Sequence, residues 1–355
     1  MVDNEGPPPG TRPALGHRLV GMARAGEWWA YKFAPILATA YATATLAGRS
    51  IGPLLPRLLL LLLALTVGAT YVSLINDWTD RADDAASGKA NRLAGQPALR
   101  VVVALLLCLG AGLGFGVYFW RLSPLTAGLY LGAWLAYSLY SLPPFRLKKR
   151  SFWGLLADAA GAHFFPQLLT AAAVSSWAGM PLPGGWLAAI GCWALGCGIR
   201  NILWHQLGDA DHDAQAGVTT FVTRRGRATG RRLAHGLAFP LELLGFAGVL
   251  GLSREWLPVL FLLLYAGLEW FRVRVWQVRL VVAEPQANHR IVLNEYYEVF
   301  YPLAFLLLQA GRYPGASLAL GLHLLLFGRH SWRSARAIGQ VLAVMWHKAS
   351  GQRPH

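Results

Sequence analysis

The stretch PRLLLLLLALTVGATYVSLINDWTDRADD, residues 56–84, decides the fold of this chain. It begins with an apolar run through Ile75, which is long enough to cross a hydrocarbon core about 30 Å thick as one helix. The leucine-rich run 58–65 has no explanation in a water-soluble protein. The stretch ends with four aspartates between Asp77 and Asp84. The sequence therefore predicts a membrane helix that carries an acidic cluster at one end.

Similar apolar runs recur along the chain, and the composition agrees with a membrane location. Of the 355 residues, 55% are hydrophobic and 14% are charged, whereas a soluble domain carries about 25% charged residues. We therefore predict an all-α, polytopic transmembrane helical bundle of nine helices, with a tenth apolar stretch at about 314–328. The nine expected helices cover 29–48, 53–76, 99–120, 122–142, 152–175, 184–207, 232–252, 255–277 and 293–310.

The chain divides into three expected parts. Residues 1–16 are rich in Pro and Gly and are expected to form a disordered N-terminal tail. Residues 17–330 are expected to form the transmembrane domain, and residues 331–355 a basic C-terminal tail.

The net charge is +15, and the distribution of basic residues among the loops predicts the orientation of the protein in the membrane. The loops after the second, fourth, sixth and eighth expected helices are basic, and the loops between them are nearly uncharged, so the basic loops and the N-terminus are expected in the cytoplasm. The basic tail favours a cytoplasmic C-terminus, and hence an even number of crossings or a re-entrant last pair. The basic residues form no aromatic-interleaved patch, so no nucleic acid is expected. The richness in Ala, Gly, Leu and Arg points to a bacterial cytoplasmic membrane.

Two clusters contain seven of the 17 acidic residues. The first cluster, at the end of the second expected helix, is Asp77, Asp80, Asp83 and Asp84, and the second, at the end of the sixth, is Asp209, Asp211 and Asp213. Like charges at helical spacing repel, and a hard divalent cation such as Mg²⁺, which is often shared between carboxylates and substrate phosphates, relieves that repulsion. The alternative is that these acids only decorate loops, which is a poor explanation for two clusters on one side. We expect the metal ligands to be Asn76, Asp77, Asp80, Asp84, Asp209 and Asp213.

Basic residues near these clusters are candidates for binding a diphosphate. Lys89 and Arg92 follow the first cluster, and Arg146 and Lys148 follow the prolines that end the fourth expected helix. Arg and Lys stabilise departing phosphoryl groups, so the last two are expected to act on the leaving diphosphate. The alternative is an ordinary positive-inside loop.

Several polar residues lie inside expected membrane helices, where such residues are costly and often functional. His205 is expected to orient or deprotonate an acceptor hydroxyl, or alternatively to bond a neighbouring helix. Arg200 and Asn201 lie one turn deeper and are expected to contact the acceptor or the diphosphate. Lys32 is expected to reach the diphosphate from the first helix. Asp158 and His163 are expected on the acceptor side.

Together these motifs resemble the UbiA superfamily of intramembrane prenyltransferases over about 29–310. The family's NDxxDxxxD motif matches Asn76 to Asp84, its DxxxD motif matches Asp209 to Asp213, and its Tyr-Ser-x-Pro-Pro-x-Arg-x-Lys stretch matches Tyr140 to Lys148. This chain departs from the family's nine helices by its tenth apolar stretch, and from the second motif by the additional Asp211 and His212.

The resemblance implies a reaction. Family members bind a prenyl diphosphate through Mg²⁺ between the two Asp motifs, ionise it to an allylic cation, and alkylate a lipophilic acceptor, such as a quinone-ring precursor, in a cavity open to the membrane lipids. On this basis the expected catalytic residues are Asp80, Asp209, Lys148 and His205. The expected diphosphate-binding residues are Lys32, Asn76, Lys89, Arg92, Tyr140, Arg146, Lys148, Arg200 and Asn201.

Two other functions stay open from the sequence. A terpene cyclase would use the same ionisation with no acceptor. A lipid or ion transporter would use the carboxylates to carry a coupling ion, although transporters usually place such groups near the membrane midplane.

Overall fold

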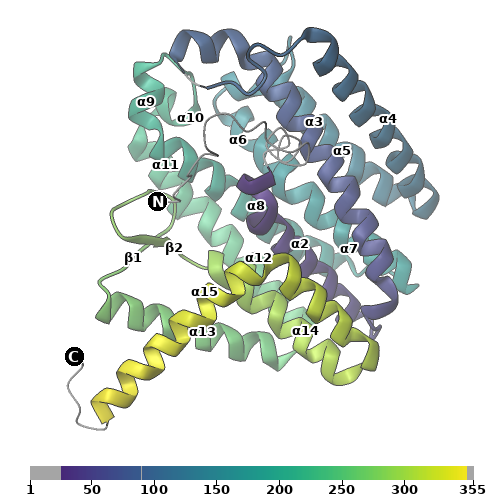
Figure 1. The fold of residues 1–355 in the computed structure, drawn as a ribbon, viewed down its shortest axis with the longest axis vertical. Coiled ribbons are helices and arrows are strands. Elements are labelled where there is room, and N and C mark those ends of the chain that lie inside the picture. Colours follow the sequence, from purple (N-terminus) through teal and green to yellow (C-terminus); the bar gives the residue numbers. More distant parts are fainter. Residues whose placement is uncertain (1–24, 89, 350–355) are drawn as a thin grey trace, which may run out of the picture.

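The computed structural model describes residues 25–88 and 90–349, which form a bundle of helices (Figure 1). The expected tail 1–16 lies outside the described residues. The first four long helices are α2 (Ala25–Leu46), α3 (Leu55–Ser87), α4 (Ala98–Leu122) and α5 (Pro124–Ser141). The short elements η1 (Gly52–Leu54) and η2 (Leu147–Lys149) precede α3 and follow α5.

Three of the later helical rods contain one turn of π-helix, each followed by a proline. The rods are α6 (Phe152–Ala159), η3 (Ala160–Phe164) and α7 (Phe165–Ala178); then α11 (Arg227–Leu233), η4 (Ala234–Ala238) and α12 (Phe239–Ser253); then η5 (Tyr296–Phe300) and α14 (Tyr301–Arg312). Proline has no N–H to donate, so the preceding turn widens rather than keeping its regular bonds. The prolines are Pro166, Pro240 and Pro302.

The centre of the bundle is α8 (Gly184–Gly208), which packs closely against α12. A Cβ atom at Gly245 of α12 would lie 2.1 Å from the backbone nitrogen of Trp193, and one at Gly196 of α8 would lie 2.4 Å from that of Glu242. Small residues allow membrane helices to approach until their backbones touch. These two glycines therefore set the spacing that brings Glu242 beside α8.

The last third of the chain crosses the others obliquely (Figure 1). It comprises α13 (Trp256–Val275), a small parallel pair of strands β1 (Arg279–Val281) and β2 (His289–Ile291), α14, η6 (Pro314–Ala316) and α15 (Ser317–Ala349). The strands were not expected from the sequence. The helix α15 contains a break at Phe327 and continues to residue 349, so the expected boundary at residue 330 falls inside it.

The helical, membrane-type architecture predicted from the sequence is confirmed, but the count of nine helices is not. In the described ranges, five helical stretches are long and apolar enough by themselves to cross a membrane. Their surfaces expose many large apolar side chains, as on α4, where Leu106, Leu107 and Leu113 are exposed. Such side chains suit contact with lipid. The five stretches are Gly52–Ala85, Ala98–Leu122, Gly184–Gly208, Arg227–Ser253 and Trp256–Val275.

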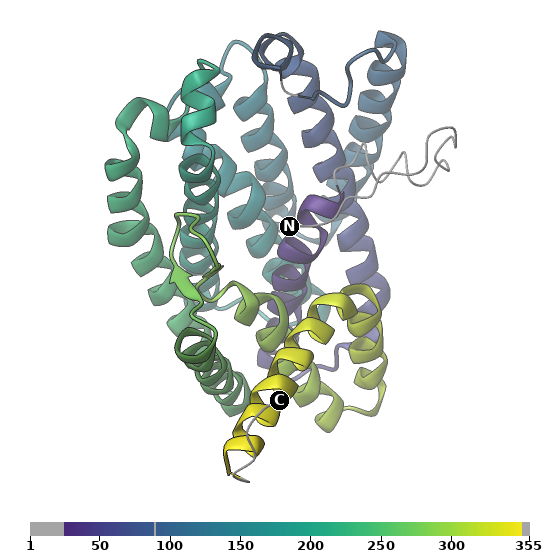
Figure 2. The ribbon, with the colours of Figure 1, turned by 60° about the vertical axis from the view of Figure 1, so that its left-hand side comes forward.

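The two acidic clusters lie at the same end of the bundle. The end of α3 and the short helices α9 (Ala210–Gln215) and α10 (Phe221–Arg225) sit together at the top of both views (Figures 1 and 2). The fold therefore brings both acidic clusters to one end of the bundle, which is the first condition for a site that they share.

Candidate active site

The first acidic cluster lies on the continuous helix α3, which extends to Ser87, beyond the end at residue 76 that the sequence predicted. Because α3 runs to Ser87, Asn76, Asp80 and Asp84 share one face. The ammonium of Lys148 lies 2.6 Å from the Asp80 carboxylate and donates to Asn76 Oδ1 at 2.8 Å. The basic loop after α5 is thus joined directly to the acidic face.

Arg146 fixes this loop against α3. Its Nη2 donates to the Thr79 carbonyl at 2.7 Å, to the Asp80 carboxylate at 2.8 Å and to that of Asp83 at 3.0 Å. Its backbone adopts a φ of 40°, a left-handed conformation that non-glycine residues rarely take and that is often found at functional sites. Burial lowers the pKa of Lys148, and the Asp80 carboxylate opposes this decrease.

The loop after α3 folds back onto the same cluster. Asn91 Nδ2 donates to Asp84 Oδ2 at 2.7 Å and to the Asp77 carbonyl at 2.8 Å. Asp77 is buried, and Arg92 is exposed. Lys89 lies outside the described residues, so its expected role stays a prediction.

The second acidic cluster is not one continuous helix. Asp209 occupies a bend between α8 and α9, and Asp213 on α9 is 5% exposed. Gly217 has a φ of 66°, a left-handed conformation that suits glycine and turns the chain so that Val218 N–H donates to the Asp213 carbonyl at 2.8 Å. Asp211, whose side chain is 85% exposed, pairs with Arg227 at 2.8 Å. Asp211 therefore points away, and Asp209 and Asp213 are the acids left for the site.

A series of polar side chains connects the two clusters through electrostatic interactions. Asp158 on α6 is within electrostatic range of Tyr140, which is also within range of Asp80. On its other side, Asp158 interacts with Lys32 on α2 and His205 on α8. His205 is one turn before Asp209, whose N–H donates to the His205 carbonyl at 2.9 Å. The sequence placed Asp158 on the acceptor side, but not between the motifs.

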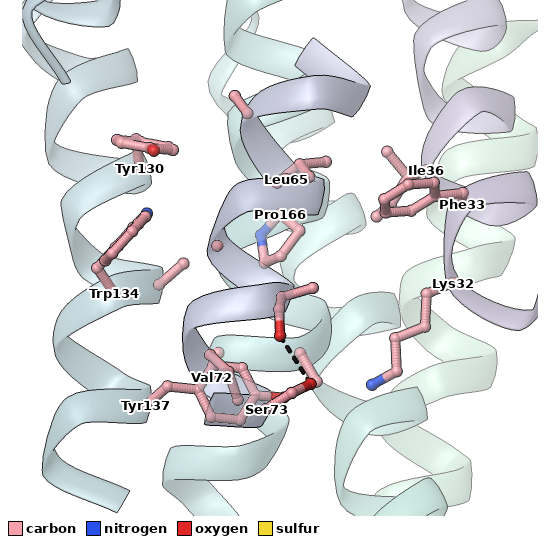
Figure 3. A pocket seen from close by; sticks show the side chains of 16 residues that line it. Lys32, Phe33, Ile36, Leu65, Val72, Ser73, Tyr130, Trp134, Tyr137 and Pro166 are labelled. Carbon is pink, nitrogen blue, oxygen red and sulfur yellow. Dashed lines mark hydrogen bonds between the residues drawn. The ribbon is translucent and has the colours of Figure 1, made fainter. Parts of the chain in front are cut away.

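An apolar cavity, called cavity 1 here, lies along the turns of α3 that precede the first cluster (Figure 3). The turns of α3 that precede Asn76 line it with Ser73, Val72 and Leu65. Figure 3 shows Tyr130, Trp134 and Tyr137 on α5, across the space from Phe33 and Ile36 on α2. Aromatic and aliphatic side chains thus surround a space that begins one turn from the acidic face.

A larger and more polar cavity, cavity 2, lies beneath the second cluster, with a volume of about 410 Å³. The turns of α8 that precede Asp209 line it with His205, Asn201 and Trp193. The roles expected of His205 and Asn201 stay predictions. Cavities 1 and 2 share three lining residues, which are Lys32, Ile36 and Ala162. Each motif therefore overlies its own cavity, and Lys32 stands where the cavities meet.

Arg200 has partners that differ from those expected. Its guanidinium binds the Glu242 carboxylate through Nε at 2.6 Å and Nη2 at 2.9 Å, and it also donates to Asn294 Oδ1 at 2.9 Å and the Val282 carbonyl at 3.2 Å. These bonds use most of its donors. Arg200 therefore joins α8, α12 and the segment after β1, and we do not assign it to the diphosphate site.

The donor set suits a magnesium ion that is shared with a substrate. Among the described residues, no group of three His, Cys, Asp or Glu side chains converges to hold an ion by itself. Mg²⁺ is commonly held by one or two carboxylates, with waters and phosphate oxygens as its other ligands. Asn76, Asp80 and Asp84 on α3, with Asp209 and Asp213 near the same end, offer oxygen donors of this kind.

A comparison with known sequences gives the family. The profile of the UbiA prenyltransferase family matches residues 36–292. The chain belongs to the UbiA prenyltransferase family. The membership predicted from three short motifs is therefore confirmed over most of the chain, and the protein is an integral membrane member of that family.

Solved UbiA structures share its fold. A UbiA homolog from Archaeoglobus fulgidus is 15% identical, with a TM-score of 0.52, and the match covers 84% of this chain and 99% of that one. The structure of a UbiA homolog from the same organism bound to GPP and Mg²⁺ gives the same values. No protein with a curated function matches this chain in sequence.

Proposed function

We propose that this UbiA-family protein is a Mg²⁺-dependent prenyltransferase that ionises an isoprenoid diphosphate and transfers the prenyl group to a lipophilic, aromatic acceptor. The observation that carries the proposal is the contact of Lys148 with Asp80 and Asn76, about one turn of α3 beyond the Ser73 end of an apolar cavity. It places cationic donors for a diphosphate beside oxygen donors for a metal.

The diphosphate end is assigned to the acidic faces. Mg²⁺ bound by Asn76, Asp80 and Asp84 on one side and by Asp209 and Asp213 on the other would neutralise the negative charge that develops on the leaving diphosphate. A related UbiA structure from Archaeoglobus fulgidus is described as bound to GPP and Mg²⁺, which supports this ligand class. Lys148, Arg146, Arg92, Tyr140 and Lys32 are assigned to the diphosphate oxygens.

The prenyl chain is assigned to cavity 1. Its lining is apolar except for a few groups near the acidic end, so it excludes water from the cation. The faces of Tyr130, Trp134 and Tyr137 supply the negative electrostatic potential that stabilises a cation. The length of the prenyl group that the protein accepts would then depend on how far cavity 1 extends along α3.

The acceptor is assigned to cavity 2, and this assignment favours a transferase over a cyclase. A cyclase needs no second polar cavity, whereas cavity 2 is lined by Asn201, His205, Asn294 and other polar groups. The acids lie at one end of the bundle rather than at its middle, which speaks against an ion-coupled transporter (Figure 1). We place this end at the cytoplasmic face of a bacterial membrane, because its loops are basic.

The test measures diphosphate release and prenyl products from geranyl, farnesyl and longer diphosphates, with purified protein in detergent and Mg²⁺. We expect Mg²⁺-dependent release that Asp80→Asn reduces by about 100-fold or more, because a charge-stabilising ligand is lost. Asp211→Asn is the matched control, since Asp211 points away from the site, and it should keep normal release. Normal turnover by Asp80→Asn, or release without a divalent ion, would refute the proposal.

A further inference from the structure

Cavity 2 is completed by residues beyond the part of the chain that matches the family profile. The profile ends at residue 292, and Asn294, Tyr297 and Glu298 close one wall of the cavity. Behind that wall, His330 of α15 lies 3.6 Å from the Glu298 carboxylate and packs edge-on to Tyr31 with ring centroids 5.4 Å apart.

The wall is built on a π-helical turn. Glu298 lies in η5, where the Tyr301 N–H bonds to the Tyr296 carbonyl five residues earlier. A second π turn, η3, brings His163 to the same cavity. Single π turns are rare and occur frequently at functional sites, since they shift a side chain out of the regular helical pattern.

Cavity 2 also contains buried polar atoms that protein groups leave unsatisfied. In the described ranges, the His163 Nε2, Trp193 Nε1 and Trp204 Nε1 atoms are buried and accept or donate no hydrogen bond. All three residues line cavity 2. A buried polar group without a hydrogen bond is energetically costly, so three around one cavity point to a ligand with several hydrogen-bonding atoms. The flat rings that carry them suit an aromatic ligand.

The charges around Glu298 leave its carboxylate available to that ligand. Glu295, on the same turn, is bound by Arg272 and Arg290, and those guanidinium groups also bind Glu269. Within the described part of the chain, Glu298 has an ion-pair contact with His330 and with no guanidinium. Glu298 thus combines burial, a place in the cavity wall and a weak cationic partner, which suits a general base.

We infer that Glu298 accepts the hydroxyl proton of an aromatic acceptor held in cavity 2, with His330 as the residue that positions its carboxylate. The inference rests on the proposed prenyltransferase function. The C–O bond between the prenyl C1 and the diphosphate breaks, and its electron pair leaves with the diphosphate. A new bond forms from the acceptor's oxygen or ring carbon to C1, while the O–H proton moves to Glu298 and later to water. After attack through carbon, the ring proton moves to the freed oxygen.

The experiment separates ionisation from transfer. Purified protein receives geranyl diphosphate, Mg²⁺ and either 4-hexylphenol or its methyl ether, and both diphosphate and prenylated product are measured. We expect the phenol alone to be alkylated by the natural protein. Glu298→Gln should lower phenol alkylation by about 100-fold, the scale of general-base catalysis, while diphosphate release changes little because ionisation takes place at the acidic motifs and does not use Glu298.

Three further variants separate a role in the chemistry from a purely structural role. His330→Asn keeps a hydrogen-bond donor beside Glu298 and should retain more alkylation than His330→Ala. Both variants should lower kcat and leave KM for the phenol unchanged. Ser334→Ala is the control for docking of α15, since Ser334 Oγ bonds Glu295 one turn further along. It should leave the ratio of alkylation to release unchanged.

The outcomes test the proposed function and the role of Glu298 separately. No Mg²⁺-dependent release by the natural protein would refute the proposed function. An equal product ratio in Glu298→Gln, or the same loss in Ser334→Ala, would each overturn the role of Glu298 and leave the proposed function standing. Release without alkylation of the phenol would overturn both the role of Glu298 and the transfer step of the proposed function.

Discussion

The Nζ atom of Lys148 lies 2.6 Å from the carboxylate of Asp80, which joins the loop after α5 to the acidic end of α3. The same ammonium reaches Asn76, so one cation connects two predicted metal ligands. In the proposed reaction, a diphosphate and its metal would share this ammonium. The contact therefore balances charge among these side chains, and the same ammonium would stabilise the leaving diphosphate during ionisation.

Lys148→Met should test that role. It keeps most of the apolar stem but removes the cation, so diphosphate release should fall by about 100-fold, as when one preorganised donor is lost. Release from geranyl diphosphate at saturating Mg²⁺ is the measurement. Lys149→Met is the control, because Lys149 contacts the more exposed Asp83. Equal rates for the two variants would contradict the assignment.

Asp213→Ala and Asp211→Ala should differ although the two acids are neighbours. Asp213 is buried at the end of the bundle that holds the first cluster, whereas Asp211 is exposed and pairs with Arg227. We expect Asp213→Ala to raise the Mg²⁺ concentration for half-maximal release by at least about 10-fold, in the range seen when metal-site partners are lost. Asp211→Ala should keep the natural value. A Mg²⁺ titration of each variant checks this, and matching curves would exclude Asp213 as a ligand.

The depth of cavity 1 should govern the length of prenyl chain that is accepted. Ala64 lines the far end of the cavity on α3, 12 residues before Asn76, or about 18 Å at 1.5 Å per residue. Ala64→Phe should therefore reduce turnover of long diphosphates by about 10-fold more than that of geranyl diphosphate. The ratio of the two kcat/KM values is the measurement. Leu59→Phe, on the exposed side of α3, should leave that ratio unchanged. An equal effect on all chain lengths would contradict this assignment of the prenyl site.

The pair Arg200 and Glu242 should prove structural. Arg200→Met leaves the fully buried Glu242 carboxylate without its partner, which should cost about 3–5 kcal/mol of stability. The double variant Arg200→Met with Glu242→Leu removes both charges and should regain much of that loss. Thermal unfolding in detergent measures stability, and diphosphate release measures function. If the double variant is stable but releases no diphosphate, Arg200 belongs to the diphosphate site after all.

The sequence determined the membrane architecture and the local faces of the motifs. The aspartates that follow the apolar run share one face if the helix continues through them, and α3 does continue to Ser87. The pairing of Arg146 and Lys148 with the first cluster also agrees with the sequence, because two prolines end the preceding helix and leave the basic residues close to the bundle end.

Only the tertiary structure decided which distant groups meet. The polar Asp158 lies between the motifs, Arg200 is taken up by Glu242, Asp211 turns outward, and Glu298 meets His330 from a separate helix. Local periodicity fixes only the face of a helix on which a residue lies. The partner opposite that face depends on how helices pack, and here on two glycines and three prolines that set the spacing of α8 and α12 and the positions of the π turns.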